Sequence, residues 1–263
     1  MKRRTKLMCA LTLCAGALTV AAQDPSPQRR SVVTVKGRVE VAGRADGERT
    51  KTRRTKDSST TPAGAIPPTV VWLTPAPGSD LRLDPPAGVT NARLVQKNKK
   101  FEPHLLVVPA GSTVEFPNRD PFFHNVFSLF EGKRFDLGLY EAGTSRTVRF
   151  DRPGISYIFC NIHPEMSAVI ITMSTPLYAT ANSDGQVSIV NVAYGRYMLH
   201  IWSESMGPEN DKPMTREITI GENAASLGVI QIPELNGRRI AHKNKYGRDY
   251  DEPTPDNGVY QQH

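Results

Sequence analysis

The sequence has little cysteine, little tryptophan and no long apolar run. Only three of its 263 residues are cysteine and two are tryptophan. Two of the cysteines, Cys9 and Cys14, lie near the N-terminus, so the rest of the chain holds one thiol, Cys160, and cannot form an internal disulfide. No apolar run reaches the ~20 residues that a membrane-spanning helix needs. These shortages exclude a disulfide-stapled scaffold and a chain built around membrane helices.

The first 22 residues have the pattern of a secretory signal peptide. Four basic residues within the first six are followed by the mostly apolar run 7–20 and by the small residues Ala21 and Ala22. A basic start, a short apolar stretch and a small-residue cleavage site are typical of such signals. Cys14 raises the alternative of a lipoprotein, but Leu13 precedes it where a small residue is expected. We therefore expect a periplasmic or secreted protein with no integral membrane segment after cleavage of residues 1–22.

The positive charge of the chain is mild once the signal is removed. Taking its four basic residues from the 33 Lys and Arg leaves 29 against 26 Asp and Glu, a net charge of +3 rather than +7. That balance does not have the basic character of a nucleic-acid-binding protein, and we expect no nucleic-acid partner. The basic run 44–56 has almost no apolar residues and is interpreted as a solvated loop.

The remaining sequence predicts an all-β protein. Residues 33–41 alternate apolar and polar side chains, which is typical of a half-buried strand. Short strand patterns separated by Gly and Pro turns recur from residue 92 to 173 and again from 187 to 232, while no segment shows helical periodicity. This pattern favours antiparallel sandwiches or barrels. The charged tail, residues 233–263, is short of aliphatic side chains and is expected to be disordered.

The most informative residues are four candidate metal ligands. Cys160, His163 and Met166 lie within seven residues, and His124 lies 36 residues before the cysteine. Each alone would more often be an ordinary core or surface residue. Together a thiolate, two imidazoles and a thioether match the His₂Cys set with a weak axial Met of blue-copper electron-transfer sites. A lone thiol in an exported chain also calls for an explanation, and metal ligation supplies one.

Residues 96–173 resemble the cupredoxin family, the plastocyanin- and amicyanin-like blue copper proteins. The resemblance rests on Phe101, Pro103, Val107, Gly111, Val114, Phe116, Asn118, Asp120, His124, Asn125, Val126, Pro153, Gly154, Tyr157, Cys160, His163 and Met166. It implies a Greek-key β-sandwich holding one type 1 copper ion. His124, Cys160 and His163 would be the equatorial ligands and Met166 the axial one.

The resemblance also implies how the site is arranged. His124 would be buried, and His163 would present a ring edge to solvent as the path for the electron. Asn125 would support the ligands by tying its strand to the cysteine-bearing loop through hydrogen bonds. An apolar rim around the exposed edge is expected from Phe122, Phe123, Phe127 and Pro164, the alternative being that at least two of the aromatic side chains pack between the sheets.

The segments on either side of this region resemble a second kind of sandwich. Residues 31–95 and 175–232 are similar to transthyretin-like or carboxypeptidase-regulatory domains, on Val35, Gly37, Val39, Asp184, Gly185, Val187, Gly195, Tyr197, Leu199, Ile201 and Trp202. Two arrangements follow. The flanks form one small β-sandwich into which the cupredoxin region is inserted, or they are two separate attachments.

The favoured function is an exported type 1 copper protein that carries single electrons between redox partner proteins, and not an enzyme. The chain lacks the His-Cys-His run that would pass electrons to a trinuclear copper cluster. One alternative is a copper storage or delivery module. Such modules favour clustered Met and His ligands, whereas Met198, Met206 and Met214 of this chain are scattered. Another is an envelope protein whose sandwich flanks bind carbohydrate or protein. His104 and His200 are interpreted as surface or structurally satisfied histidines, and Asp136 as a turn residue.

Overall fold

The computed structural model describes residues 31–42, 65–207, 212–233 and 243–250. These ranges consist of β-strands, connecting turns and one short 3-10 helix, η1 (Glu204–Met206), with no α-helix among them. The predicted all-β fold is therefore confirmed. The proposed signal, residues 1–22, and the basic run 44–56 lie outside the described residues. No helix within the described ranges is long and apolar enough to cross a membrane.

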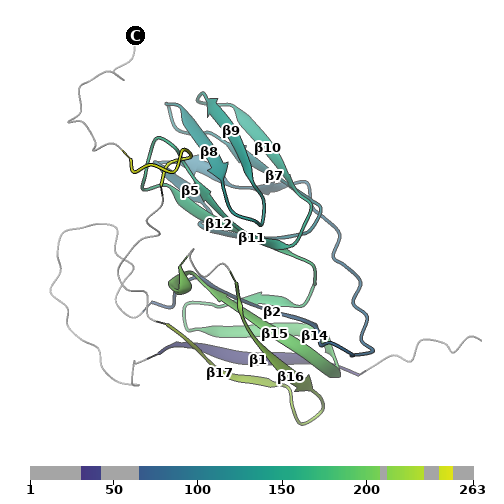
Figure 1. The fold of residues 1–263 in the computed structure, drawn as a ribbon. Coiled ribbons are helices and arrows are strands. Elements are labelled where there is room, and N and C mark those ends of the chain that lie inside the picture. The colour runs from purple at the N-terminus through teal and green to yellow at the C-terminus, as the bar shows by residue number, and fades with distance from the viewer. Residues whose placement is uncertain (1–30, 43–64, 208–211, 234–242, 251–263) are drawn as a thin grey trace, which may run out of the picture. The chain divides into compact units, whose positions relative to one another are not determined.

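The central part of the chain forms a sandwich of two sheets (Figure 1). One sheet has the order β10-β7-β3 and the other the order β6-β12-β11-β8-β9, with the short pair β4-β5 beside them. Their bounds are β3 (Ala92–Arg93), β4 (Val95–Lys97), β5 (Lys100–Glu102), β6 (Leu105–Pro109), β7 (Ser112–Pro117), β8 (His124–Ser128), β9 (Phe135–Tyr140), β10 (Ser145–Phe150), β11 (Gly154–Phe159) and β12 (Ser167–Met173). Since β3 pairs with β7, this sandwich begins at Ala92, before the boundary at residue 96 that the resemblance suggested.

Both sheets contribute side chains to one core. Phe116 and Phe150 come from the first sheet, and Tyr140 and Ile158 come from the second. Cys160 and Met166, on the loop between β11 and β12, belong to the same buried cluster. The two candidate ligands with sulfur atoms are thus part of the hydrophobic core, which holds them by packing.

The two flanking segments share their sheets. One sheet has the order β14-β1-β17 and the other the order β13-β2-β15-β16. Their bounds are β1 (Val32–Val41), β2 (Thr69–Pro75), β13 (Tyr178–Thr180), β14 (Gln186–Ala193), β15 (Gly195–Ser203), β16 (Met214–Ile220) and β17 (Ser226–Ile232). Strand β1 pairs with β14 and β17, and β2 pairs with β13 and β15. The sequence before residue 92 and the sequence after residue 173 therefore meet in the same two sheets, around a core of their own.

The strand order of the five-stranded sheet brings the candidate ligands together. Strand β11 pairs with β12 along its length and with β8 at its end, where Phe159 lies opposite Phe127. All five residues of β8 are buried, as are the last five of β11, in keeping with their β-branched and aromatic content. His124, at the start of β8, thus comes close to the loop that follows β11.

Candidate metal centre

The candidate ligand loop connects β11 to β12 and is closed by two backbone hydrogen bonds. The amide of Cys160 donates to the carbonyl of Met166 at 3.3 Å, and the amide of Met166 donates to the carbonyl of His163 at 3.0 Å. This short closed loop explains the regular spacing of Cys160, His163 and Met166. It keeps the cysteine and the second histidine on one compact turn at the end of the sheet.

Three donor atoms converge at this loop. The sulfur of Cys160 lies 3.7 Å from Nδ1 of His124 and 3.6 Å from Nδ1 of His163. These three atoms all lie within 4.8 Å of one another, and no other group of three or more His, Cys, Asp or Glu ligands occurs among the described residues. A trigonal ion with bonds of about 2.0 Å to nitrogen and about 2.3 Å to sulfur separates those donors by roughly 3.7 Å. The spacing therefore fits a first-row transition-metal ion.

The site is buried except at one histidine. The side chains of His124, Cys160 and Met166 are fully buried, and His163 is partly exposed. This is the burial that the resemblance implies for the two histidines. Burial lowers the pKa of His124, and burial together with the neighbouring His124 lowers the pKa of His163 to about 4. Both rings are consequently neutral at pH 7 and carry a lone pair for a metal.

The thiol of Cys160 faces backbone amides as well as the two rings. Burial raises the pKa of this thiol above its usual value, and hydrogen bonds from the backbone amides of Asn125, Ile162 and His163 offset only part of that rise. These amides favour the thiolate form, which is the form that binds metals. A cation bound between the three donors would stabilise the Cys160 thiolate further.

Asp120 holds the buried histidine. Its carboxylate Oδ2 accepts a hydrogen bond from Nε2 of His124 at 2.8 Å, and both side chains are almost completely buried. The proton on Nε2 leaves Nδ1 unprotonated and directed at Cys160. Carboxylate support of this kind orients histidine ligands and makes them stronger donors. In the sequence, Asp120 is part of the family pattern only, and its position four residues before His124 is the signal that points to this role.

The same carboxylate is fixed by the turn between β4 and β5. Oδ1 accepts from the backbone amide of Asn98 at 2.6 Å, and Oδ2 accepts from that of Lys99 at 3.0 Å. Although burial raises the pKa of Asp120, the hydrogen bonds from Lys99, His124 and Asn98 hold it below its usual range. Asp120 is therefore ionised and held on three sides.

Asn125 makes different hydrogen bonds from those expected. Its side-chain amide donates to Oδ1 of Asp136 at 2.7 Å and to the carbonyl of Gly138 at 2.9 Å. These groups belong to β9, so the side chain ties β8 to β9. The link from Asn125 to the ligand loop is its backbone amide, which faces Cys160. Asp136, at a position where the sequence predicts a turn, lies in β9 and is thus part of the support of the site.

The expected apolar rim is present only in part. The Phe122 ring contacts the rings of both His124 and His163, with centroid distances of 5.2 and 5.5 Å. Phe123 is 52% exposed and Pro164 is exposed. The prediction for Phe127 was wrong, because its side chain is buried and packs against Phe159 in the neighbouring strand.

His104 and His200 have partners outside the candidate metal centre. His104 contacts the carbonyl of Ser167 through Nδ1 and the carboxylate of Glu204 through Nε2, at 3.1 and 2.6 Å. The hydrogen bond to Glu204 raises the pKa of His104. His200 stacks on Trp72 with a centroid distance of 5.1 Å. Neither ring is part of the metal centre.

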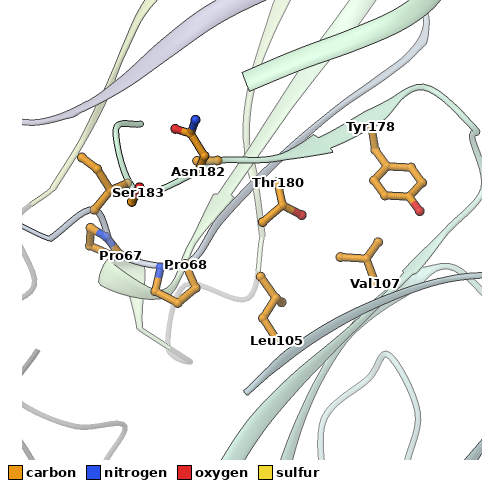
Figure 2. A pocket seen from close by; sticks show the side chains of 10 residues that line it. Pro67, Pro68, Leu105, Val107, Tyr178, Thr180, Asn182 and Ser183 are labelled. Carbon is orange, nitrogen blue, oxygen red and sulfur yellow. The ribbon is translucent and has the colours of Figure 1, made fainter. Parts of the chain in front are cut away.

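A surface pocket elsewhere in the chain offers no comparable chemistry. Figure 2 shows its lining, which includes Pro67, Pro68, Leu105, Val107, Tyr178, Thr180, Asn182 and Ser183. The lining residues include no His, Cys, Asp or Glu. Among the described residues, the candidate metal centre is the one place where three or more His, Cys, Asp or Glu side chains are grouped closely enough to hold a metal ion.

The chain is similar to copper proteins of known structure over about a third of its length. A Cu-containing nitrite reductase from Thermus scotoductus is 27% identical, with 34% of this chain and 23% of that chain covered and a TM-score of 0.30. A purple cupredoxin from Nitrosopumilus maritimus is 22% identical, with 32% of this chain and 100% of that chain covered and a TM-score of 0.29. A methionine variant of amicyanin with Cu(I) is 18% identical, with 36% of this chain and 98% of that chain covered and a TM-score of 0.30. This chain thus spans about a quarter of the nitrite reductase. No protein-family profile and no curated protein sequence matches it.

Proposed function

We propose that the protein is an exported type 1 copper protein that carries one electron at a time between redox partner proteins. The observation that supports this most directly is the convergence of Cys160 Sγ with Nδ1 of His124 and of His163 in a buried site. A thiolate with two imidazoles is the donor set of blue-copper centres. Export rests on the signal pattern of residues 1–22.

Each ligand residue has a separate task in this proposal. When bound, copper supplies a one-electron couple between its two oxidation states. Cys160 and His124 hold it within the core, and the Asp120 carboxylate keeps the His124 ring in one tautomer. His163 is partly exposed and would offer its ring edge to a partner, next to the ring of Phe122. Such an arrangement suits brief docking and short-range transfer of an electron.

Met166, the proposed fourth donor, favours an electron carrier over an enzyme. Met166 is fully buried, and its backbone is hydrogen-bonded to both Cys160 and His163. If the Met166 thioether were the fourth donor, all four donors would come from the protein. Catalytic metal sites instead keep a position open for water or substrate.

The experiment that tests this function is a visible spectrum of the purified protein with one equivalent of Cu(II), before and after ascorbate. We expect an intense blue or green band that is lost on reduction and returns in air. The intensity comes from charge transfer between the Cys160 thiolate and the metal. A pale solution would reject the proposal, and the sandwich of the flanking segments would then be the place to search for function.

Replacing Met166 by leucine is expected to leave one copper bound per chain and to raise the reduction potential. The axial ligand tunes the potential of such sites, and leucine removes the sulfur donor while nearly conserving volume, at a cost to stability of less than about 1.5 kcal/mol. The potential is measured by redox titration of the visible band. Met173→Leu, at a buried methionine of another core cluster, is the matched control and should not shift it. Loss of copper from Met166→Leu would count against an axial role.

A further inference from the structure

Composition predicts disorder for the charged tail 233–263, and the structure describes residues 233 and 243–250 of it. Residues 243–250, drawn in yellow in Figure 1, form a tight turn. The amide of Asn244 donates to the carbonyl of Arg248, and the Asn244 side-chain oxygen accepts from the amides of Tyr246 and Arg248. The turn is held by polar groups rather than by aliphatic packing. This is why a composition poor in aliphatic residues did not reveal it.

This turn contacts the candidate ligand loop at two points. The hydroxyl of Tyr250 donates to the backbone carbonyl of Cys160 at 2.8 Å. The backbone amide of Lys245 donates to the side-chain oxygen of Asn161 at 2.9 Å. Cys160 is fully buried, and a buried carbonyl without a donor is costly. Tyr250 therefore satisfies a backbone group of the cysteine itself.

The turn also contacts the strands that position His124. The ammonium group of Lys245 lies 2.8 Å from Oδ2 of Asp136, whose Oδ1 accepts from the side chain of Asn125. Asn125 directly follows His124 and also presents its backbone amide to Cys160. Through Lys245 the turn thus spans the two segments that carry the ligands, the loop after β11 and the β8–β9 pair.

We propose that residues 243–250 are a clamp on the metal centre, in which Tyr250 and Lys245 are positioning residues that hold the ligand loop closed against β8 and β9. The clamp acts on the protein with or without metal, because all of its contacts are to backbone and polar side chains rather than to a ligand atom. The part of this inference that concerns copper binding rests on the proposed function. The effect of the clamp on the conformation of the ligand loop is independent of that function.

The two kinds of contact should contribute unequally. The Lys245–Asp136 ion pair is partly exposed, with side-chain exposures of 22% and 40%, and exposed ion pairs contribute little. The Tyr250 hydrogen bond reaches a buried carbonyl. We therefore expect Tyr250→Phe to loosen the loop more than Lys245→Met, which keeps the backbone hydrogen bond to Asn161.

The test that needs no metal is the reactivity of the Cys160 thiol. In the full chain with Cys9 and Cys14 changed to serine, Cys160 is the single thiol and reacts with a chromogenic aryl disulfide only when the loop opens. Tyr250→Phe should raise the reaction rate about tenfold, the equivalent of one buried hydrogen bond. Tyr246→Phe is the matched control, because Tyr246 is 72% exposed. Equal rates in the two variants would overturn the clamp.

Truncation tests the whole segment. A chain ending at residue 242 loses the clamp together with the 13 residues after it, whereas a chain ending at residue 250 keeps the clamp and loses only those last 13 residues. We expect the shorter chain to release copper to a chelator at least about tenfold faster, with the longer one unchanged. Equal release from both chains would contradict the clamp. If the intact protein binds no copper, the proposed function fails, and the thiol rates still decide whether the clamp exists.

Discussion

Replacing Cys160 by serine is expected to abolish the intense visible absorption of the copper-loaded protein. The band depends on charge transfer from a thiolate, and a serine hydroxyl at the same position cannot supply it. The sulfur of Cys160 is the atom that lies within 3.7 Å of both histidine nitrogens, so no other donor in the group can replace it. The absorption should fall to the weak band of copper held by nitrogen and oxygen ligands.

This result must be separated from unfolding. Cys160 is fully buried in the core with Met166 and Ile158, and burying the more polar serine hydroxyl there costs about 1–3 kcal/mol wherever its hydrogen bonds are incomplete. Far-ultraviolet circular dichroism should show that the variant keeps its β structure, with a somewhat lower Tm. The double variant Cys9→Ser, Cys14→Ser is the control and should retain the full colour. Strong colour in the Cys160→Ser protein would eliminate the proposed ligand set.

The features of this protein that could be predicted are those that appear as patterns over a few neighbouring residues. Alternation of apolar and polar residues predicts β1, and the all-β character follows from many short apolar segments between Gly and Pro turns. The interval from Cys160 to His163 and from His163 to Met166 corresponds to one closed loop at the end of a strand. Local spacing therefore identifies the fold class and the loop that carries Cys160 and His163, whereas His124, 36 residues before Cys160, is found from its residue type and its strand-like surroundings.

The supporting residues could not be predicted in this way, because their contacts join distant positions. Tyr250 lies 90 residues from Cys160, and Lys245 lies 109 residues from Asp136. Polar side chains that bind a backbone carbonyl leave no periodic pattern, and a charged tail suggests disorder by composition alone. Phe127 was expected in the rim but is buried. All five residues of β8 are buried, and in a strand buried on both faces, alternation does not show which way a side chain points.

The largest effect expected at a residue that is not itself a ligand is that of Asp120→Asn. Loss of carboxylate support for a histidine ligand typically costs about 10–100-fold in metal affinity, and we expect copper affinity to fall in that range. The two carboxylate oxygens of Asp120 accept from three donors, Nε2 of His124 and the amides of Asn98 and Lys99. Asparagine has one oxygen, and its amide nitrogen would face at least one of these donors without forming a hydrogen bond.

Affinity is measured by competition with a chelator of known copper affinity, and the Tm of the metal-free protein is measured alongside. Asp151→Asn is the matched control, because Asp151 pairs with Lys133 at an exposed position and contacts no ligand. Asp120→Asn should lower the metal-free Tm as well, since an unpaired donor remains beside a nearly buried side chain. If the variant has a lower Tm but unchanged copper affinity, Asp120 stabilises the turn between β4 and β5 and does not support the metal centre. Unchanged affinity and unchanged Tm would mean that the hydrogen bond to His124 contributes neither to the fold nor to the metal centre.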